Sequence, residues 1–242
     1  MIWIDETSII LGHRRGSIKV WRTISEGRHP VTGTIRTRWN GASEFMWWSY
    51  YSYDYKGPFH IWKAETAAEK TAAQKAIDAL NAVLEPLAKA EWEITNGTRR
   101  IGLRNLPGIA PTWKFTKKTG AYVREKGKGG IDWWRYKQTI LIPLLIPFTK
   151  QCNMEQLAKG LPPMLVQEDK APAHSCKYQT EIFQKDNILR LLWPGNSPDL
   201  NMIEQCWAWM KRDTTKYGPP ENRLTAESVW TRCWNKLPDA KI

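Results

Sequence analysis

The chain has 242 residues, with 36 Lys or Arg against 24 Asp or Glu and a formal net charge of +12. This length suits one large domain or a domain with an insertion, and 42% hydrophobic residues exclude a chain that is disordered throughout. The longest apolar run, residues 140–148, contains two prolines and is too short to span a bilayer about 30 Å thick. Because the N-terminus also has no secretory signal pattern, we expect an intracellular protein with no membrane partner.

Strand patterns dominate the first quarter of the chain. Alternating or aromatic-rich runs predict β-strands over residues 2–4, 17–22 and 45–52, and a short fourth strand over 60–62. From residue 64 to 92 the composition changes to Ala, Glu, Lys, Gln and Leu, with apolar residues in helical steps that predict an amphipathic helix. We expect Pro86 to kink or split this helix.

A basic segment rich in Gly and Pro follows, and it is expected to form an irregular arm. Residues 98–137 contain eleven Lys or Arg and two acidic residues, interleaved with aromatic side chains. Such a mixture suits a polyanion whose bases can stack, so nucleic acid is the expected partner, while a solvated basic loop without a ligand stays an alternative. The predicted DNA contacts are Arg99, Arg100, Lys114, Lys117, Lys118, Arg124, Lys126 and Lys128.

The second half of the chain alternates between helices and short strands. We predict a helix from residue 131 to about 141 that can continue past Pro143, a buried strand over 164–167, a helix over 175–185 and a strand over 188–192. The predicted architecture is a single mixed α/β domain over residues 1–242, with an insertion over 64–130 that comprises the helix and the basic arm.

A last helix is predicted to begin at Ser197. Ser197 is a suitable N-cap, Pro198 fits the first helical position, and Asp199 favours the first turn. The expected apolar face consists of Leu200, Ile203, Trp207 and Met210. Glu204 lies at the margin of that face, so we expect it to point towards the sheet.

Three acidic residues stand out by their positions. Asp5 ends the first predicted strand, Asp169 ends the buried strand, and Glu204 lies in the last helix. Functional groups of α/β sheets gather at the carboxyl ends of strands, and converging carboxylates suit Mg²⁺ or Mn²⁺. Two such ions can activate an attacking oxygen and stabilise the leaving oxygen of a phosphodiester. Spacing alone does not single out this triplet, because the chain has 24 acidic residues.

The residues around these acids show a specific resemblance. The segments WIDETS (3–8), VQEDKAPAH (166–174) and WPGNSPDLNMIEQCW (193–207) closely resemble the catalytic segments of Tc/mariner-type DDE transposases, in a version similar to those of fungi. Thirty-four residues separate Asp169 from Glu204, which is similar to the spacing in that family.

The resemblance implies an RNase H-like fold, a mixed central sheet flanked by helices, in which Asp5, Asp169 and Glu204 are the catalytic residues and bind two Mg²⁺ or Mn²⁺ ions. It implies DNA phosphodiester hydrolysis and strand transfer, with transposon ends and target DNA as partners, a homodimer as a candidate assembly, and a nuclear location. His174 and Asn201 are the candidate supporting residues around the site, although local backbone bonding is the alternative role of His174.

The chain also departs from the family pattern. Met1 stands four residues before Asp5, so we expect the N-terminal helix-turn-helix modules of the family to be absent. Lys170 replaces a common Asn, and Glu168 adds a carboxylate beside the site. Two alternatives therefore remain: a catalytically silent or domesticated DNA-binding relic, and a general RNase H-like nuclease.

Overall fold

The chain forms two compact units in the computed structural model. The structure describes residues 1–11, 44–53, 55–102, 112–124, 130–169, 171–191, 197 and 200–237. The sheet unit comprises residues 1–63, 144–170 and 186–242, and the helical unit comprises residues 64–143 and 171–185. Within the described residues, no helix is long and apolar enough to cross a membrane.

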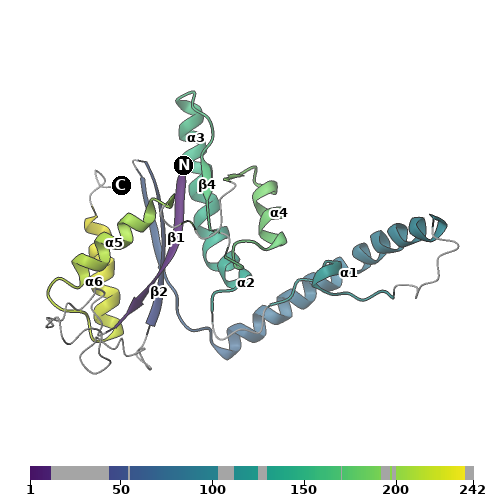
Figure 1. Cartoon of the computed structure of the whole chain (residues 1–242), viewed down its shortest axis with the longest axis horizontal. Coiled ribbons are helices and arrows are strands. Elements are labelled where there is room, and N and C mark those ends of the chain that lie inside the picture. Colours follow the sequence, from purple (N-terminus) through teal and green to yellow (C-terminus); the bar gives the residue numbers. More distant parts are fainter. Residues whose placement is uncertain are drawn as a thin grey trace, which may run out of the picture. The chain divides into compact units, whose positions relative to one another are not determined.

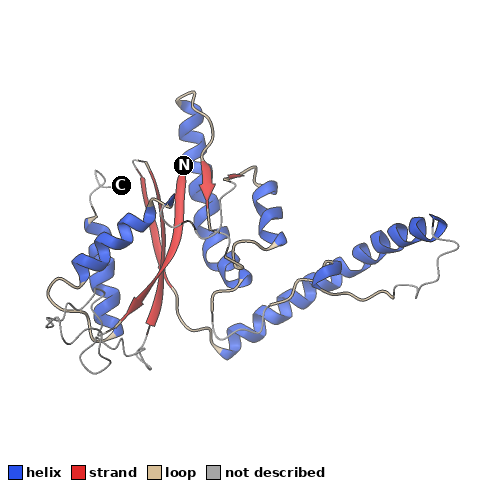
Figure 2. Ribbon diagram, in the orientation of Figure 1, coloured by secondary structure: helices blue, strands red, loops and turns tan. Residues whose placement is uncertain are grey.

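The sheet unit is built on a mixed five-stranded sheet with the order β3-β2-β1-β4-β5. Figure 1 labels β1, β2 and β4, and Figure 2 shows the strands in red. β1, β2 and β3 pair antiparallel, whereas β4 runs parallel to β1 and β5 parallel to β4. The strands are β1 (Ile2–Ile10), β2 (Glu44–Ser52), β3 (Tyr55–Ile61), β4 (Leu165–Gln167) and β5 (Leu189–Arg190). The predicted mixed α/β class is therefore confirmed.

The strand predictions differ from the structure mainly in length. β1 and β3 are longer than the predicted runs at 2–4 and 60–62, because antiparallel pairing with β2 extends both of them. β5 is shorter than predicted, with two residues paired to β4. The strand predicted over 17–22 lies outside the described residues.

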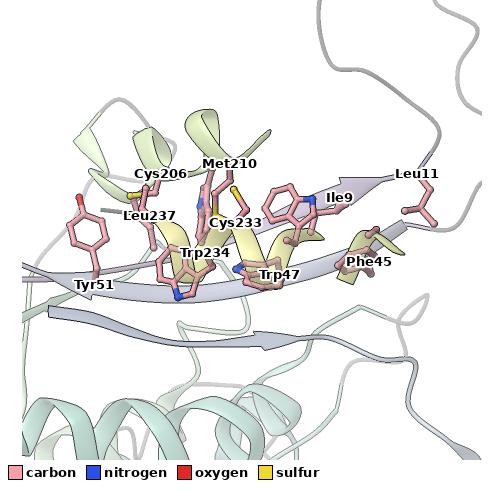
Figure 3. Close-up of a cluster of buried hydrophobic side chains, with 14 residues drawn as sticks. Ile9, Leu11, Phe45, Trp47, Tyr51, Cys206, Met210, Cys233, Trp234 and Leu237 are labelled. Atoms are coloured by element: carbon pink, nitrogen blue, oxygen red, sulfur yellow. The ribbon is translucent and has the colours of Figure 1, made fainter. Parts of the chain in front are cut away.

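A tryptophan-rich core covers one face of the sheet (Figure 3). It lies between the strands and two helices, α5 (Ile203–Thr214) and α6 (Arg223–Lys236). The ring of Trp47 on β2 stacks on Phe59, with 4.3 Å between centroids, and its centroid lies 5.7 Å from that of Trp230 on α6. On the other face of the sheet, α3 (Ile146–Ala158) places Phe148 against Tyr50, with ring centroids 4.5 Å apart.

The start of α5 corrects the sequence prediction. The helix begins at Ile203, with Met202 in the N-cap position, and not at Ser197. Leu200 is half exposed and precedes the helix, whereas the rest of the predicted apolar face is buried. The physical reason lies in Asn201, whose side-chain amide donates a hydrogen bond to the Ile4 carbonyl and so holds the chain to β1 before the helix begins. Pro198 and Asp199 lie outside the described residues.

The helical unit contains one long helix, α1 (Ala67–Gly102). It continues through Pro86, so the predicted end at residue 92 and the predicted split are both wrong. α1 also includes Arg99 and Arg100, which the sequence had assigned to the irregular arm. Later in the unit, α2 (Trp133–Tyr136) passes directly into a π-helix (Lys137–Leu145) that continues into α3, so the chain stays helical past Pro143. α4 (Lys177–Lys185) matches the predicted helix closely.

Polar contacts join the pieces of the helical unit around a small aromatic cluster of Ile77, Tyr122 and Trp133. The Asn81 side chain bonds both the N–H and the carbonyl of Tyr122, at 2.8 Å each. Arg124 pairs with Glu65 at 2.9 Å and with Asp132 at 2.6 Å. These contacts hold the segment of residues 121–124 against the start and middle of α1.

Candidate active site

Asp5 lies in the middle of β1, on the face that carries α5 and α6. Trp3, two residues earlier, packs against the core beneath these helices, and residues two apart on a strand share a face. The Asp5 side chain is half-buried, and its Oδ1 accepts a hydrogen bond of 2.8 Å from the Glu6 N–H. Asp5 therefore faces towards the helix that contains Glu204.

Asp169 follows β4, the parallel neighbour of β1. The pairing of these strands sets Trp3 beside Gln167, and the two aspartates each lie two residues beyond this pair. Parallel neighbouring strands advance together, so Asp5 and Asp169 lie towards the same end of the sheet. Asp169 is half-buried.

Glu204 is the second residue of α5 and is half-buried. Its N–H donates to the Asn201 carbonyl at 3.0 Å, while the Asn201 side chain donates to the Ile4 carbonyl at 3.3 Å. Asn201 thus connects the first turn of α5 to the residue before Asp5. Its burial inside the sheet unit is consistent with the supporting role predicted from the sequence.

The charges of nearby acids act on Asp5. Burial is the main cause that raises its pKa to about 8; the charges of Glu6, Glu204 and Asp169 also raise it, and the hydrogen bond from the Glu6 N–H lowers it. Glu204 and Asp169 therefore lie near enough to Asp5 for their charges to affect its pKa. In the described part of the chain, however, no three His, Cys, Asp or Glu side chains are grouped closely enough to hold one metal ion.

The additional carboxylate at Glu168 has a partner that the sequence did not reveal. Glu168 is buried, and its Oε2 lies 3.1 Å from a guanidinium nitrogen of Arg190 on β5. The ion pair balances the Glu168 charge within the sheet, so this carboxylate is not an obvious addition to the acidic site. Lys170 lies outside the described residues.

Gln167 is a buried polar residue beside the site that sequence analysis missed. Its side chain is fully buried, and neither its amide nitrogen nor its oxygen has a hydrogen-bond partner within the described residues. Gln167 is the last residue of β4, and Asp169 follows it by two residues. The signal that could have revealed it is this two-residue spacing of polar side chains in a strand otherwise predicted to be buried.

His174 belongs to the helical unit, whereas the three acids belong to the sheet unit. It is buried, its ring lies 4.4 Å from that of Tyr136 between centroids, and its backbone N–H donates to the Ala171 carbonyl at 2.8 Å. Both roles considered from the sequence stay predictions.

The predicted DNA contacts fall into three groups. Lys114, Lys117 and Lys118 are exposed on the helical unit, the last two in a 3₁₀ turn (Lys117–Thr119). Arg124 is mostly buried in its ion pairs with Glu65 and Asp132. The side chains of Arg99 and Arg100 lie outside the described part, as do Lys126 and Lys128 altogether.

Comparison with known proteins identifies the region around two of the acids. Residues 144–223 match the family model described as DDE superfamily endonuclease, and this span contains Asp169 and Glu204. This part of the chain is similar to the DDE superfamily endonucleases. The chain is also distantly similar to the transposable element Tcb2 transposase of Caenorhabditis briggsae, with 41% identity over 46 residues. That alignment covers 19% of this chain and 17% of the relative.

The description of the family names an endonuclease, which suggests nuclease chemistry for the matched part of the chain. The match agrees with the resemblance found in the sequence segments at 166–174 and 193–207. Asp5 lies outside the matched residues, so its connection to the site rests on the structure: its place on β1 and its electrostatic coupling to Glu204 and Asp169.

Proposed function

We propose that this chain is an RNase H-like DDE catalytic domain of the Tc/mariner type, which hydrolyses DNA phosphodiester bonds and transfers DNA strands. Asp5, Asp169 and Glu204 are the proposed catalytic residues. The observation that carries the proposal is the placement of the acids: Asp5 and Asp169 each lie two residues beyond the Trp3–Gln167 pair of neighbouring parallel strands, and Asn201 connects the first turn of α5 to Ile4. Such a concentration of carboxylates disfavours ionisation unless a cation is near.

The donor set fits divalent cations. All three side chains offer carboxylate oxygens, which suit Mg²⁺ or Mn²⁺ better than soft metals, and we propose that they hold two such ions. When bound, the ions would promote deprotonation of the attacking water or hydroxyl and stabilise the leaving oxygen. Asn201 would keep the first turn of α5, and hence Glu204, near Asp5 through its bond to the Ile4 carbonyl.

The proposed substrates are transposon ends and target DNA, so we expect the protein to work in the nucleus. Lys114, Lys117 and Lys118 supply exposed positive charge next to the aromatic residues Trp113 and Phe115, whose rings stack with centroids 6.2 Å apart. Cationic and aromatic side chains together suit phosphates and bases. We leave Arg124 out of the proposed contacts because two carboxylates already balance its charge.

Nicking of a supercoiled plasmid with Mg²⁺ or Mn²⁺ tests the catalytic proposal. We expect the parent chain to nick, and Asp169→Asn and Glu204→Gln each to reduce the rate by about 100-fold or more, since each removes a charge required in the transition state. Glu221→Gln is the matched control, because it changes an exposed acid on the sheet unit away from the three site acids, and should nick like the parent. Equal nicking by the parent and Asp169→Asn would overturn the assignment.

A silent DNA-binding relic is the second candidate, and the exposed lysines Lys114, Lys117 and Lys118 favour it, because they could bind DNA without any contribution from the three acids. The same experiment separates the two functions. Salt-sensitive DNA binding without nicking by the parent, under both metals, would support the relic.

A salt titration tests the proposed DNA contacts. We expect replacement of Lys114, Lys117 and Lys118 by Gln to weaken DNA binding and to lower the slope of log affinity against log salt by about 2 to 3, because each phosphate contact contributes close to one. Replacing Lys70, Lys159 and Lys185 by Gln removes the same charge elsewhere and should alter the slope less. An unchanged slope in the first variant would remove these residues from the contact surface.

A further inference from the structure

α1 has two apolar faces, and the helical unit uses one of them. Ala73 and Ile77 are buried, and Leu80 and Leu84 pack against the aromatic cluster. A second row of apolar side chains lies in solvent, which we call the outer stripe. It consists of Ala72, Ala76, Ala79, Val83, Leu87, Ala90 and Ile94, all exposed.

The outer stripe is unusually apolar for a solvent-facing surface. Val83, Leu87 and Ile94 are 68%, 66% and 70% exposed. Successive members are three or four residues apart, so they remain on one side of the helix over a length of about 33 Å. A continuous apolar row of this length is typical of an interaction surface, whereas scattered exposed apolar residues would need no explanation.

The stripe is arranged symmetrically around Val83. When two copies of α1 are laid antiparallel with their Val83 residues opposite each other, Ile94 of one faces Ala72 of the other. In the same register Leu87 faces Ala79, and Ala76 faces Ala90. Each large side chain therefore meets a small one, which is the arrangement that lets two helices interdigitate without voids or clashes.

Charged residues beside the stripe match the same register. Lys75 and Glu93 are eighteen residues apart, which is five helical turns, so both lie on one flank of the stripe. In the antiparallel pair Lys75 of one copy approaches Glu93 of the other. Lys89 and Glu93 also pair within the helix at 4.0 Å, but both side chains stay more than half exposed and can accept a second partner.

We propose that the outer stripe is a self-association surface, on which a second copy of this chain packs antiparallel with Val83 at the two-fold axis. The surface is isologous: each residue pairs with its counterpart in reverse order, as a two-fold contact requires. The surface is independent of the proposed nuclease activity, because the three site acids lie in the sheet unit and the stripe in the helical unit.

Cysteine cross-linking of the full chain tests the register. Single variants Val83→Cys, Ala72→Cys and Ile94→Cys are treated with a short bismaleimide, and the parent, whose four native cysteines are buried or half-buried, measures the background. We expect Val83→Cys to form cross-linked dimers alone. Ala72→Cys and Ile94→Cys should each stay monomeric alone and cross-link when the two are mixed.

Each outcome decides the proposal. Cross-linking of all three single variants would indicate a parallel pair, and cross-linking of none would indicate that no second copy packs on the stripe; either result overturns the proposal. The measurement needs no catalytic activity, so its failure is distinguishable from failure of the proposed function.

Sedimentation equilibrium of the full chain provides the second measurement. We expect a monomer–dimer equilibrium that Leu87→Glu weakens at least tenfold, while Glu85→Gln, a change to an exposed side chain off the stripe, leaves it unchanged. Lys75→Glu and Glu93→Lys should each weaken the dimer, and the double variant should restore it. A monomeric parent at concentrations of about 100 μM, or a double variant no better than the single ones, would contradict the antiparallel register.

Discussion

The two units are stabilised by different kinds of interaction. The sheet unit buries large aromatic side chains between distant parts of the chain, such as Trp47 on β2 against Trp230 on α6. The helical unit joins its segments with polar contacts, above all Arg124 with Glu65 and Asp132, around a small aromatic cluster.

The two units also differ in the function that we propose for them: catalysis for the sheet unit, and binding of DNA and of a second copy for the helical unit. The proposed catalytic acids come from β1, the end of β4 and the start of α5, so a large core assembled from long-range contacts is needed to position them. The surfaces that we propose for DNA and for a second copy lie on the helical unit, where a single long helix and a short turn present their residues almost independently of the core. The difference also predicts that a substitution that destabilises one unit should leave the stability of the other unit nearly unchanged.

The largest effect is expected from Trp47→Ala. Trp47 is fully buried, and truncation of a buried Trp costs about 3–5 kcal/mol of unfolding free energy through lost burial and a residual cavity. Hydrogen exchange would show faster opening of α5 and α6, while α1 keeps the protection of the parent. Tyr217→Ala is the control, because Tyr217 is 94% exposed. Equal loss of protection in α1 would show that the two units unfold as one.

A smaller effect is expected from Arg124→Met. Loss of the guanidinium leaves the mostly buried carboxylates of Glu65 and Asp132 without their cation, which we expect to cost about 3 kcal/mol. The loss should appear in the amides of α1 and α2 and not in those of the sheet unit. Lys118→Met, an exposed change of equal charge, should have little effect. A stability loss spread over both units would contradict the view that each unit is stabilised by its own interactions.

The effect of Asp5→Asn should depend on pH. Because the folded state raises the pKa of Asp5 to about 8, it holds the proton more tightly than the unfolded state, and stability falls as pH rises from about 4 to 8. Asn cannot ionise, so we expect the variant to exceed the parent by on the order of 2 kcal/mol at pH 8.5 without divalent ions, and to lose this advantage towards pH 4. Denaturant titrations across pH measure the difference; a pH-independent difference would show that burial of Asp5 does not disfavour its charge.

The smallest effect is expected from Lys56→Met. The Lys56 ammonium donates to the carbonyls of Trp234 and Leu237, at 3.0 Å each, and of Asn235 at 3.2 Å, at the carboxyl end of α6. A cation there satisfies terminal carbonyls and balances the helix dipole, so its loss should cost about 1 kcal/mol and fray the end of α6. Lys63→Met, at an exposed lysine, is the control. Unchanged protection of the last turn of α6 would rule out this capping role.

Much of the fold could be predicted from local patterns. The alternating aromatic residues of β2 identified a strand within one residue of its observed start, and the apolar spacing of 77–87 identified α1. The three acids were recognised because of their places in the predicted elements and because the surrounding segments resemble a known family, although Asp5 lies within β1 and not at the end of a strand. The predictions failed at boundaries: helix periodicity could not show that α1 absorbs Pro86, or that α5 starts only after Asn201.

Sequence alone determined the elements and the candidate acids, because periodicity, capping residues and motif spacing are properties of neighbouring residues. Only the tertiary structure decided the pKa and the charge partners of these acids. The pKa of Asp5 depends on its burial and on the charges of neighbouring acids, including Glu204 and Asp169. The neutralisation of Glu168 depends on Arg190, and the start of α5 depends on a bond between Asn201 and the Ile4 carbonyl, 197 residues away. Burial and charge interactions act through space, so they follow from the packing of distant segments and not from the order of residues along the chain.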